Sequence, residues 1–130
     1  MRQGRLRLAL VVLGTLAVVT LPSCGFKRKL VSITMIPSAA DIQGADVDVQ
    51  FKAIGNYIHP PDSRDITDSV VWESSSPQIV SITPTGLATS QLGGCGTIPI
   101  TAKGHSDPHD DSSGIVVGTA LVTVTQPGCP

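Results

Sequence analysis

The sequence predicts an all-β protein, built as an antiparallel β-sandwich of about seven strands. Short runs in which apolar and polar residues alternate recur along the chain, separated by turn residues such as Gly, Pro, Asp and Ser. Such alternation is typical of strands with one buried face. Val, Ile and Thr, which favour strands, are abundant, and no helical period follows Leu21. Residues 24–130 suffice for one small domain, and no internal repeat is visible.

Residues 1–23 have a short basic start, an uncharged apolar run and a small residue before a cysteine. Met1 to Arg7 is short and basic, and residues 8–21 carry no charge. This run is shorter than the ~20 apolar residues that a membrane-spanning helix needs, but it suits a signal-peptide core. It ends in Leu21-Pro22-Ser23-Cys24, which resembles the lipobox, where a cysteine after a small residue is acylated and becomes residue one. The alternative is an ordinary secretory signal followed by a coincidental cysteine.

The lipobox resemblance implies a membrane anchor at Cys24, with palmitate among its acyl chains. Residues 24–29 would then form a lipidated basic tether. Its three cations, Lys27, Arg28 and Lys29, are either solvated or paired with anionic headgroups, each such pair contributing ~1 kcal/mol. Gly25 follows the cysteine, and the absence of Asp there resembles outer-membrane lipoproteins of Gram-negative cells. We therefore expect a protein of the bacterial cell envelope, in the outer membrane if the cell is Gram-negative.

The charge of residues 24–130 argues against nucleic acid as a partner. The whole chain has nine Lys and Arg and ten Asp and Glu; residues 1–23 hold three of the basic residues and no acidic ones. Residues 24–130 therefore carry 6 − 10 = −4 with His neutral. A nucleic-acid-binding domain is expected to show a basic face instead.

The stretch from Val70 to Ala102 carries a family pattern. A strand with Trp and Ser-Ser is followed by a Pro turn, two apolar residues two positions apart, a Gly-Leu turn, and a Gly before a final Ile-x-Ala strand. The residues concerned are Trp72, Ser74, Ser75, Pro77, Val80, Ile82, Gly86, Leu87, Gly96, Ile100 and Ala102. This pattern resembles the group 2 bacterial immunoglobulin-like domain. The resemblance implies an immunoglobulin-like sandwich over residues 30–130 and the setting of adhesins and other surface proteins.

Alternation predicts the position and the inward face of each strand. The expected strands are Leu30 to Ile36, Asp46 to Ile54, Val70 to Ser74, Ile79 to Ile82, Leu87 to Thr89, Thr97 to Lys103 and Ile115 to Thr125. The inward residues of the first two are Val31, Ile33 and Met35, then Val47, Val49, Phe51 and Ala53. Trp72 alternates with Val70, so we expect it in the core rather than stacked on a ligand. Pro99 lacks an N–H, which predicts a strand edge or a bulge there.

Cys95 and Cys129 are expected to form a disulfide. With Cys24 acylated, they are the remaining pair in an oxidising compartment; two free thiols are the alternative. They flank the last two strands, which we expect to form a hairpin. A turn centred on His109 would place Thr97 opposite Leu121, which leaves Cys129 beyond the ladder. A turn nearer Ser112, a bulge at Pro99, or a tail folded back at Pro127-Gly128 would close that gap.

Two polar loops contain the candidate metal ligands. Residues 59–68 and 105–111 are expected at the same end of an immunoglobulin-like sandwich. The donor side chains are His59, Asp62, His105, Asp107, His109, Asp110 and Asp111, which suit zinc through His or calcium through carboxylates. Their spacing matches no ligand motif, so solvated loops without metal are the favoured interpretation. No cofactor is expected.

No catalytic motif is visible, so we expect a protein that is not an enzyme. The favoured function is binding or adhesion, with one lipid-anchored immunoglobulin-like domain engaging a protein or glycan. The alternatives are a structural envelope lipoprotein that packs against a larger assembly, and a metal-binding loop module. The sequence leaves the partner's identity and the oligomeric state open.

Overall fold

The computed structural model describes residue 25 and residues 27–130, and these form ten strands. Cys24 and the expected signal peptide lie outside the described residues. The strands are β1 (Lys29–Ile36), β2 (Ala39–Gln43), β3 (Asp48–Gln50), β4 (Lys52–Ile58), β5 (Asp62–Asp65), β6 (Val71–Ser74), β7 (Val80–Ile82), β8 (Leu87–Ser90), β9 (Gly96–His105) and β10 (Ile115–Thr125). Among the described residues, no helix is long and apolar enough to cross a membrane.

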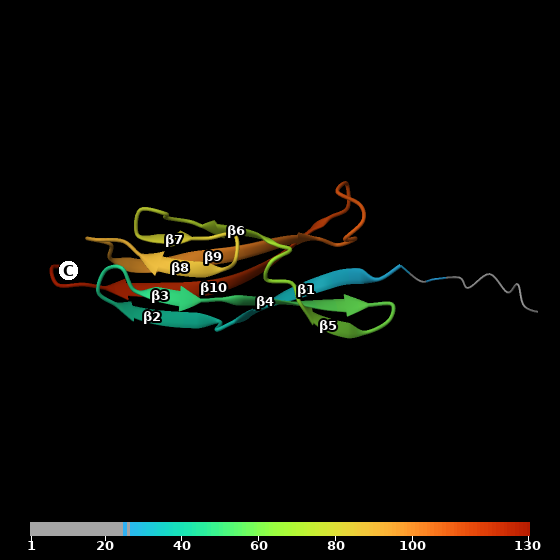
Figure 1. Cartoon of the computed structure of the whole chain (residues 1–130), viewed down its shortest axis with the longest axis horizontal. Helices are drawn as coiled ribbons and strands as arrows, with labels where there is room; N and C mark the ends of the chain where they lie inside the picture. The colour runs from blue at the N-terminus through green and yellow to red at the C-terminus, as the bar shows by residue number, and fades with distance from the viewer. Residues whose placement is uncertain (1–24, 26) are drawn as a thin grey trace, which may run out of the picture.

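The strands form an all-β sandwich, as predicted. One layer is the four-stranded sheet β2-β10-β9-β6, and the other contains the three-stranded sheets β1-β4-β5 and β3-β8-β7 (Figure 1). The core between them includes four fully buried residues, Phe51, Val80, Ile100 and Val122. Ten strands are present rather than about seven, and β2 pairs in parallel with β10, which the antiparallel prediction missed.

The predicted strand from Asp46 to Ile54 is in fact two strands in two sheets. β3 pairs with β8, whereas β4 pairs with β1 and β5. The chain changes partner at the fully buried Phe51, whose N–H donates to the carbonyl of Gly86 at 2.8 Å. Inward alternation continues to Tyr57, past the expected end, but Val47 is 37% exposed, so its predicted burial was wrong.

The first strand carries an irregularity that the sequence did not reveal. The register with β4 shifts between Leu30 and Ser32, so the alternation changes phase at Val31. Leu30 is buried and Val31 is 46% exposed, which reverses the prediction for Val31. Ile33 and Met35, beyond the shift, are buried as predicted.

Trp72 is a core residue, as predicted. It and Val70 are 9% and 8% exposed, whereas Val71 between them is 67% exposed. The indole N–H donates to the carbonyl of Thr67 at 2.8 Å, which satisfies its one polar group. The ring also lies against Gly86, where an added Cβ would lie 2.9 Å from a ring carbon and φ is +82°. Only glycine fits this turn without strain.

The last two strands form the predicted hairpin with a different register. Ile115 lies opposite His105 and Thr97 opposite Thr123, so the turn centres on residue 110 and Thr97 does not face Leu121. The ladder runs through Pro99 without a bulge. The carbonyl of Pro99 accepts from the N–H of Ser75, just past the last residue of β6. β9 is an inner strand of its sheet, so Pro99 lies neither on an edge strand nor at a bulge, and both predicted alternatives were wrong. The missing N–H of Pro99 is tolerated because it faces the point where β6 has ended.

The predicted disulfide joins Cys95 and Cys129, whose Cα atoms are 5.7 Å apart. The tail turns back after β10: the N–H of Cys129 donates to the carbonyl of Gln126 at 3.0 Å, and Gly128 has φ +97°. The turn at residues 126–129 therefore closes the gap that the strand register alone leaves. The bridge lies at the end of the sandwich that holds the C-terminus (Figure 1).

Candidate functional site

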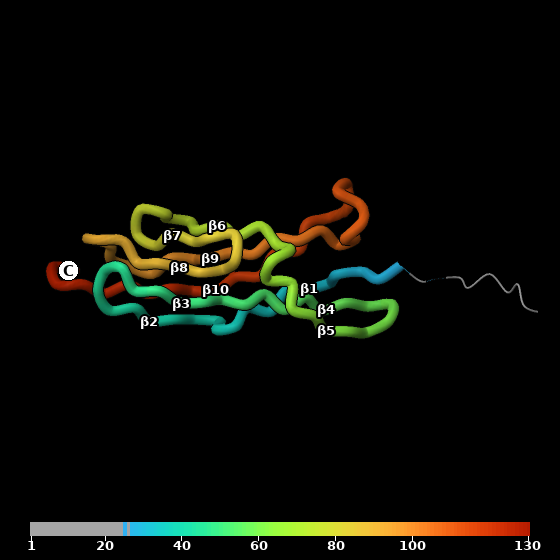
Figure 2. The backbone as a smooth tube through the Cα atoms, in the orientation of Figure 1, coloured from blue at the N-terminus to red at the C-terminus, as the bar shows by residue number. Residues whose placement is uncertain are grey.

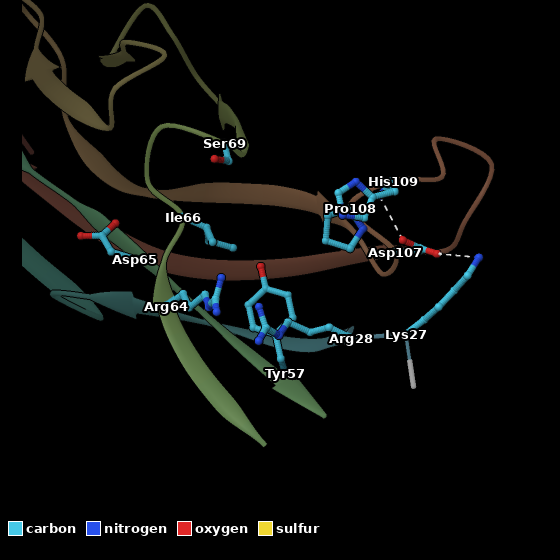
Figure 3. A pocket seen from close by; sticks show the side chains of 10 residues that line it. All are labelled: Lys27, Arg28, Tyr57, Arg64, Asp65, Ile66, Ser69, Asp107, Pro108 and His109. Atoms are coloured by element: carbon cyan, nitrogen blue, oxygen red, sulfur yellow. Dashed lines mark hydrogen bonds and ion pairs between the residues drawn. The ribbon is translucent and has the colours of Figure 1, made fainter. Parts of the chain in front are cut away.

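The other end of the sandwich contains a groove. There the β4–β5 hairpin, the β9–β10 loop and the N-terminal segment project together (Figure 2), as expected for the two polar loops. The N–H of Leu30 donates to the carbonyl of Ser106 at 2.7 Å, which fixes the start of β1 beside the β9–β10 loop. The hollow between these segments measures about 470 Å³ (Figure 3). Its floor is apolar, formed by Tyr57, Ile66 and Pro108, and its rim is charged.

Two arginines meet beside the single tyrosine of the chain. The guanidinium carbon of Arg28 lies 5.9 Å from the centre of the Tyr57 ring, within the range of a cation–π contact. Asp62 lies between the arginines, with one carboxylate oxygen 2.7 Å from Nε of Arg64 and 3.7 Å from a terminal nitrogen of Arg28. The hydrogen bond from Arg64 lowers the pKa of the Asp62 carboxyl, so Asp62 is ionised at neutral pH.

Two buried polar atoms at this end have no hydrogen-bond partner. Among the described residues, these are Nε of Arg28 and Nδ1 of His105. His105 lines a second hollow of about 340 Å³ that shares Tyr57, Ile66 and Pro108 with the groove. Buried polar groups in folded proteins are nearly always satisfied, so two such atoms in adjoining hollows indicate a binding surface.

The basic tether residues contact the domain itself. Lys27 lies 4.0 Å from a carboxylate oxygen of Asp107, and Arg28 lies beside Asp62. The expectation that these cations are either free in solvent or held by headgroups is therefore incomplete. Lys27 is 88% exposed, so its ion pair is weak; the Arg28 side chain is only 33% exposed and forms part of the groove wall.

The candidate metal ligands lie at the same end but do not converge. Among residues 25 and 27–130, no group of three or more His, Cys, Asp or Glu side chains could hold an ion. Asp107 accepts from the N–H of His109 at 3.0 Å, and Asp110 accepts from the N–H and hydroxyl of Ser112. The hydroxyl lowers the pKa of the Asp110 carboxyl. His59 lies in the β4–β5 turn, and Asp111 lines the second hollow.

Tyr57 and Arg64 line the groove, although the sequence alone did not mark either as a candidate site residue. Tyr57 lies beyond the expected end of its strand, and Arg64 faces Gly55 across the β4–β5 pair. The available signal was alternation, since Tyr57 continues the inward series of Ala53 and Gly55. No local pattern in the sequence indicates that Arg28, from the tether, lines the same groove as Tyr57 and Arg64.

The outward face of the four-stranded sheet is a second candidate surface. Val117, Lys103 and Val71 lie side by side across three strands, and Leu121 follows on β10. Of the eight large hydrophobic residues that are exposed in the described chain, four lie on this face: Val71, Ile115, Val117 and Leu121. The charges at its centre, Lys103 and Glu73, neutralise each other in an ion pair.

No protein-family model matches the chain, and no curated protein matches it significantly.

Proposed function

We propose that this chain is a lipid-anchored cell-envelope protein that presents a single immunoglobulin-like domain for binding or adhesion to a protein or glycan. The observation that carries the proposal is the apolar outward face of the sheet β2-β10-β9-β6. Exposed apolar residues are common singly, but half of the large ones that are exposed in the described chain share this face around the Lys103–Glu73 ion pair, and such a cluster marks an interaction site. The strands β2, β10, β9 and β6 contain 5, 11, 10 and 4 residues. At ~3.3 Å per residue and ~4.8 Å between strands they cover about 500 Å² per partner, near the lower limit of specific complexes.

The arrangement of the domain suits display from a membrane. Its strands run along its long axis, and the N-terminal segment leaves at one end (Figure 1). A chain anchored at Cys24 would therefore present the sheet face sideways, where a partner can approach. A surface with four exposed apolar side chains around one ion pair favours a protein partner over a glycan, which requires many hydrogen-bonding groups.

Site-specific photo-cross-linking in the native cell tests the binding face. Leu121 on this face and Val31 on the opposite layer are each 46% exposed, which makes them a matched pair. A photoreactive amino acid at Leu121 is expected to capture a discrete partner, and the same residue at Val31 is not. Equal capture at both positions, or none at Leu121, would contradict the proposal.

The anchor is tested separately by labelling. Labelled palmitate is expected to enter the wild-type protein, and Cys24→Ala is expected to abolish incorporation, because no other cysteine precedes the domain. Cys95 and Cys129 are joined in the disulfide and serve as an internal control. Label retained in Cys24→Ala would exclude this cysteine as the acylation site.

A structural role is the second candidate, and the same apolar face favours it. In that case the domain packs permanently against a larger envelope assembly. The two roles differ in stoichiometry: a structural subunit co-purifies with its assembly in a fixed ratio, whereas an adhesion module exchanges with free partner.

A further inference from the structure

The arginine pair in the groove has more hydrogen-bonding capacity than the protein uses. A guanidinium offers five N–H donors in a planar fork. Arg28 donates no hydrogen bond within 3.5 Å to any described residue, and its Nε is buried. Arg64 uses Nε for Asp62. Apart from the buried Nε of Arg28, the remaining donors of both side chains are therefore available beside the hydroxyl-bearing ring of Tyr57.

The charges around the pair leave an excess of one positive charge at the centre of the groove. Two guanidinium groups share one carboxylate, that of Asp62. The two acids that line the groove, Asp65 and Asp107, lie at its opposite ends, as Figure 3 shows, and each already accepts hydrogen bonds. Asp65 accepts from the N–H and hydroxyl of Thr67, and Asp107 accepts from His109.

We propose that this groove is a binding site for a phosphate group, held by the guanidinium groups of Arg28 and Arg64 beside Tyr57. Phosphate oxygens match the planar fork of arginine and satisfy several donors at once. The carboxylate of Asp62 lies beside the same two guanidinium groups and competes with phosphate for them, which keeps the affinity for phosphate modest. The phosphate could belong to a membrane lipid or to a soluble ligand. Arg28 follows the proposed anchor by four residues, a reach of at most ~14 Å, which places lipid headgroups close by.

The site stands on the groove alone, whereas its lipid source rests on the proposed anchoring. The test uses the full chain as the cell exports it, in a phosphate-free maltoside detergent, with labelled aromatic rings. The chain contains one tyrosine and one tryptophan, so each gives its own set of NMR signals. Tyr57 reports on the groove, and the buried Trp72 serves as an internal control.

Glycerol phosphate is expected to shift the Tyr57 signals saturably, and glycerol is not. Arg28→Gln is expected to weaken binding about five- to tenfold, and Asp62→Asn to strengthen it by a similar factor, because each changes the central charge by one. Arg64→Gln provides a second weakening variant if Arg28→Gln disturbs the fold. Lys103→Gln, which changes a charge on the distant sheet face, is the matched control and is expected to have no effect.

The opposite effects expected of Arg28→Gln and Asp62→Asn on the affinity for glycerol phosphate distinguish a binding site from a structural ion pair. If Arg28 and Asp62 merely stabilise the loops, both substitutions would weaken binding together, and the proposal would be wrong. It would also be overturned by no saturable shift, or by equal shifts with glycerol. Tighter binding of dihexanoylphosphatidylglycerol than of glycerol phosphate would assign the site to a lipid headgroup; equal or weaker binding would assign it to a soluble phosphate compound. The palmitate experiment remains independent of either result.

Discussion

The two ends of the sandwich differ in how their polar groups are satisfied. At the C-terminal end, the Cys95–Cys129 bridge closes the tail, and the side chain of Gln126 bonds both the N–H of Gly93 and the carbonyl of Gln91. The fully buried Ser90 hydroxyl accepts from the N–H of Val47 and donates to a neighbouring carbonyl. At the N-terminal end, by contrast, buried atoms of Arg28 and His105 have no hydrogen-bond partner within the described chain.

This contrast separates stability from binding. The C-terminal end uses covalent and hydrogen-bonded closure, which leaves little free donor capacity for a ligand. The N-terminal end has a groove with charged walls and an apolar floor, and there the donor capacity remains available. Substitutions at the closed end should therefore affect unfolding, and substitutions in the groove should affect ligand binding with smaller effects on the fold.

The largest effect is expected from Trp72, which lies against Gly86 and bonds Thr67 and so joins segments from both layers. Trp72→Ala is expected to lower the free energy of unfolding by ~3–5 kcal/mol, because it leaves a large cavity and an unpaired carbonyl. Denaturant unfolding monitored by circular dichroism measures this. A variant with a midpoint close to that of the wild type would show that the core tolerates the cavity.

Removal of the disulfide comes next. Cys95→Ser with Cys129→Ser opens a segment whose ends are separated by 34 positions. In the chain-entropy model the loss is ~4 kcal/mol. Hydrogen exchange should show faster opening of the end of β10 and the tail, while the Tyr57 signals of the groove stay unchanged. Disturbance of the groove in this variant would show that the two ends are coupled.

These two sites also show what the sequence could predict. Alternation with period two assigned the burial of Trp72 and Val70, and the compartment together with the flanking strands predicted the disulfide. Alternation failed at Val31 because a bulge depends on the pairing with the partner strand, which local sequence does not encode. The groove could not be predicted in full, because Arg28, Tyr57 and Arg64 come from three segments that meet only in the folded chain.

A smaller effect is expected from acid. The carboxyls of Asp62, Asp65 and Asp110, all in β5 or the β9–β10 loop, have lowered pKa values because of hydrogen bonds from Arg64, Thr67 and Ser112. A lowered folded-state pKa gives stability that is present above the unfolded value of 3.8 and lost as pH falls through the folded value. Below about pH 4, hydrogen exchange should therefore accelerate at the N-terminal end first. Acceleration that begins at the disulfide end would contradict this assignment.

The smallest effect is expected from divalent metal. His105, Asp107, His109 and Asp110 lie at the groove end, but the described residues contain no group of three donors that could hold an ion. A ligand stabilises a fold only in proportion to the logarithm of its concentration over its dissociation constant. Because no three donor side chains of the described chain converge, zinc or calcium should change the melting temperature by less than ~1 °C, as calorimetry with and without a chelator would measure.

A large rise in melting temperature that disappears in the double variant His105→Ala with His109→Ala would identify the N-terminal end of the sandwich as a metal site. The groove would then have to be reinterpreted around the ion, since a bound cation would reverse the charge balance that favours phosphate at the arginine pair.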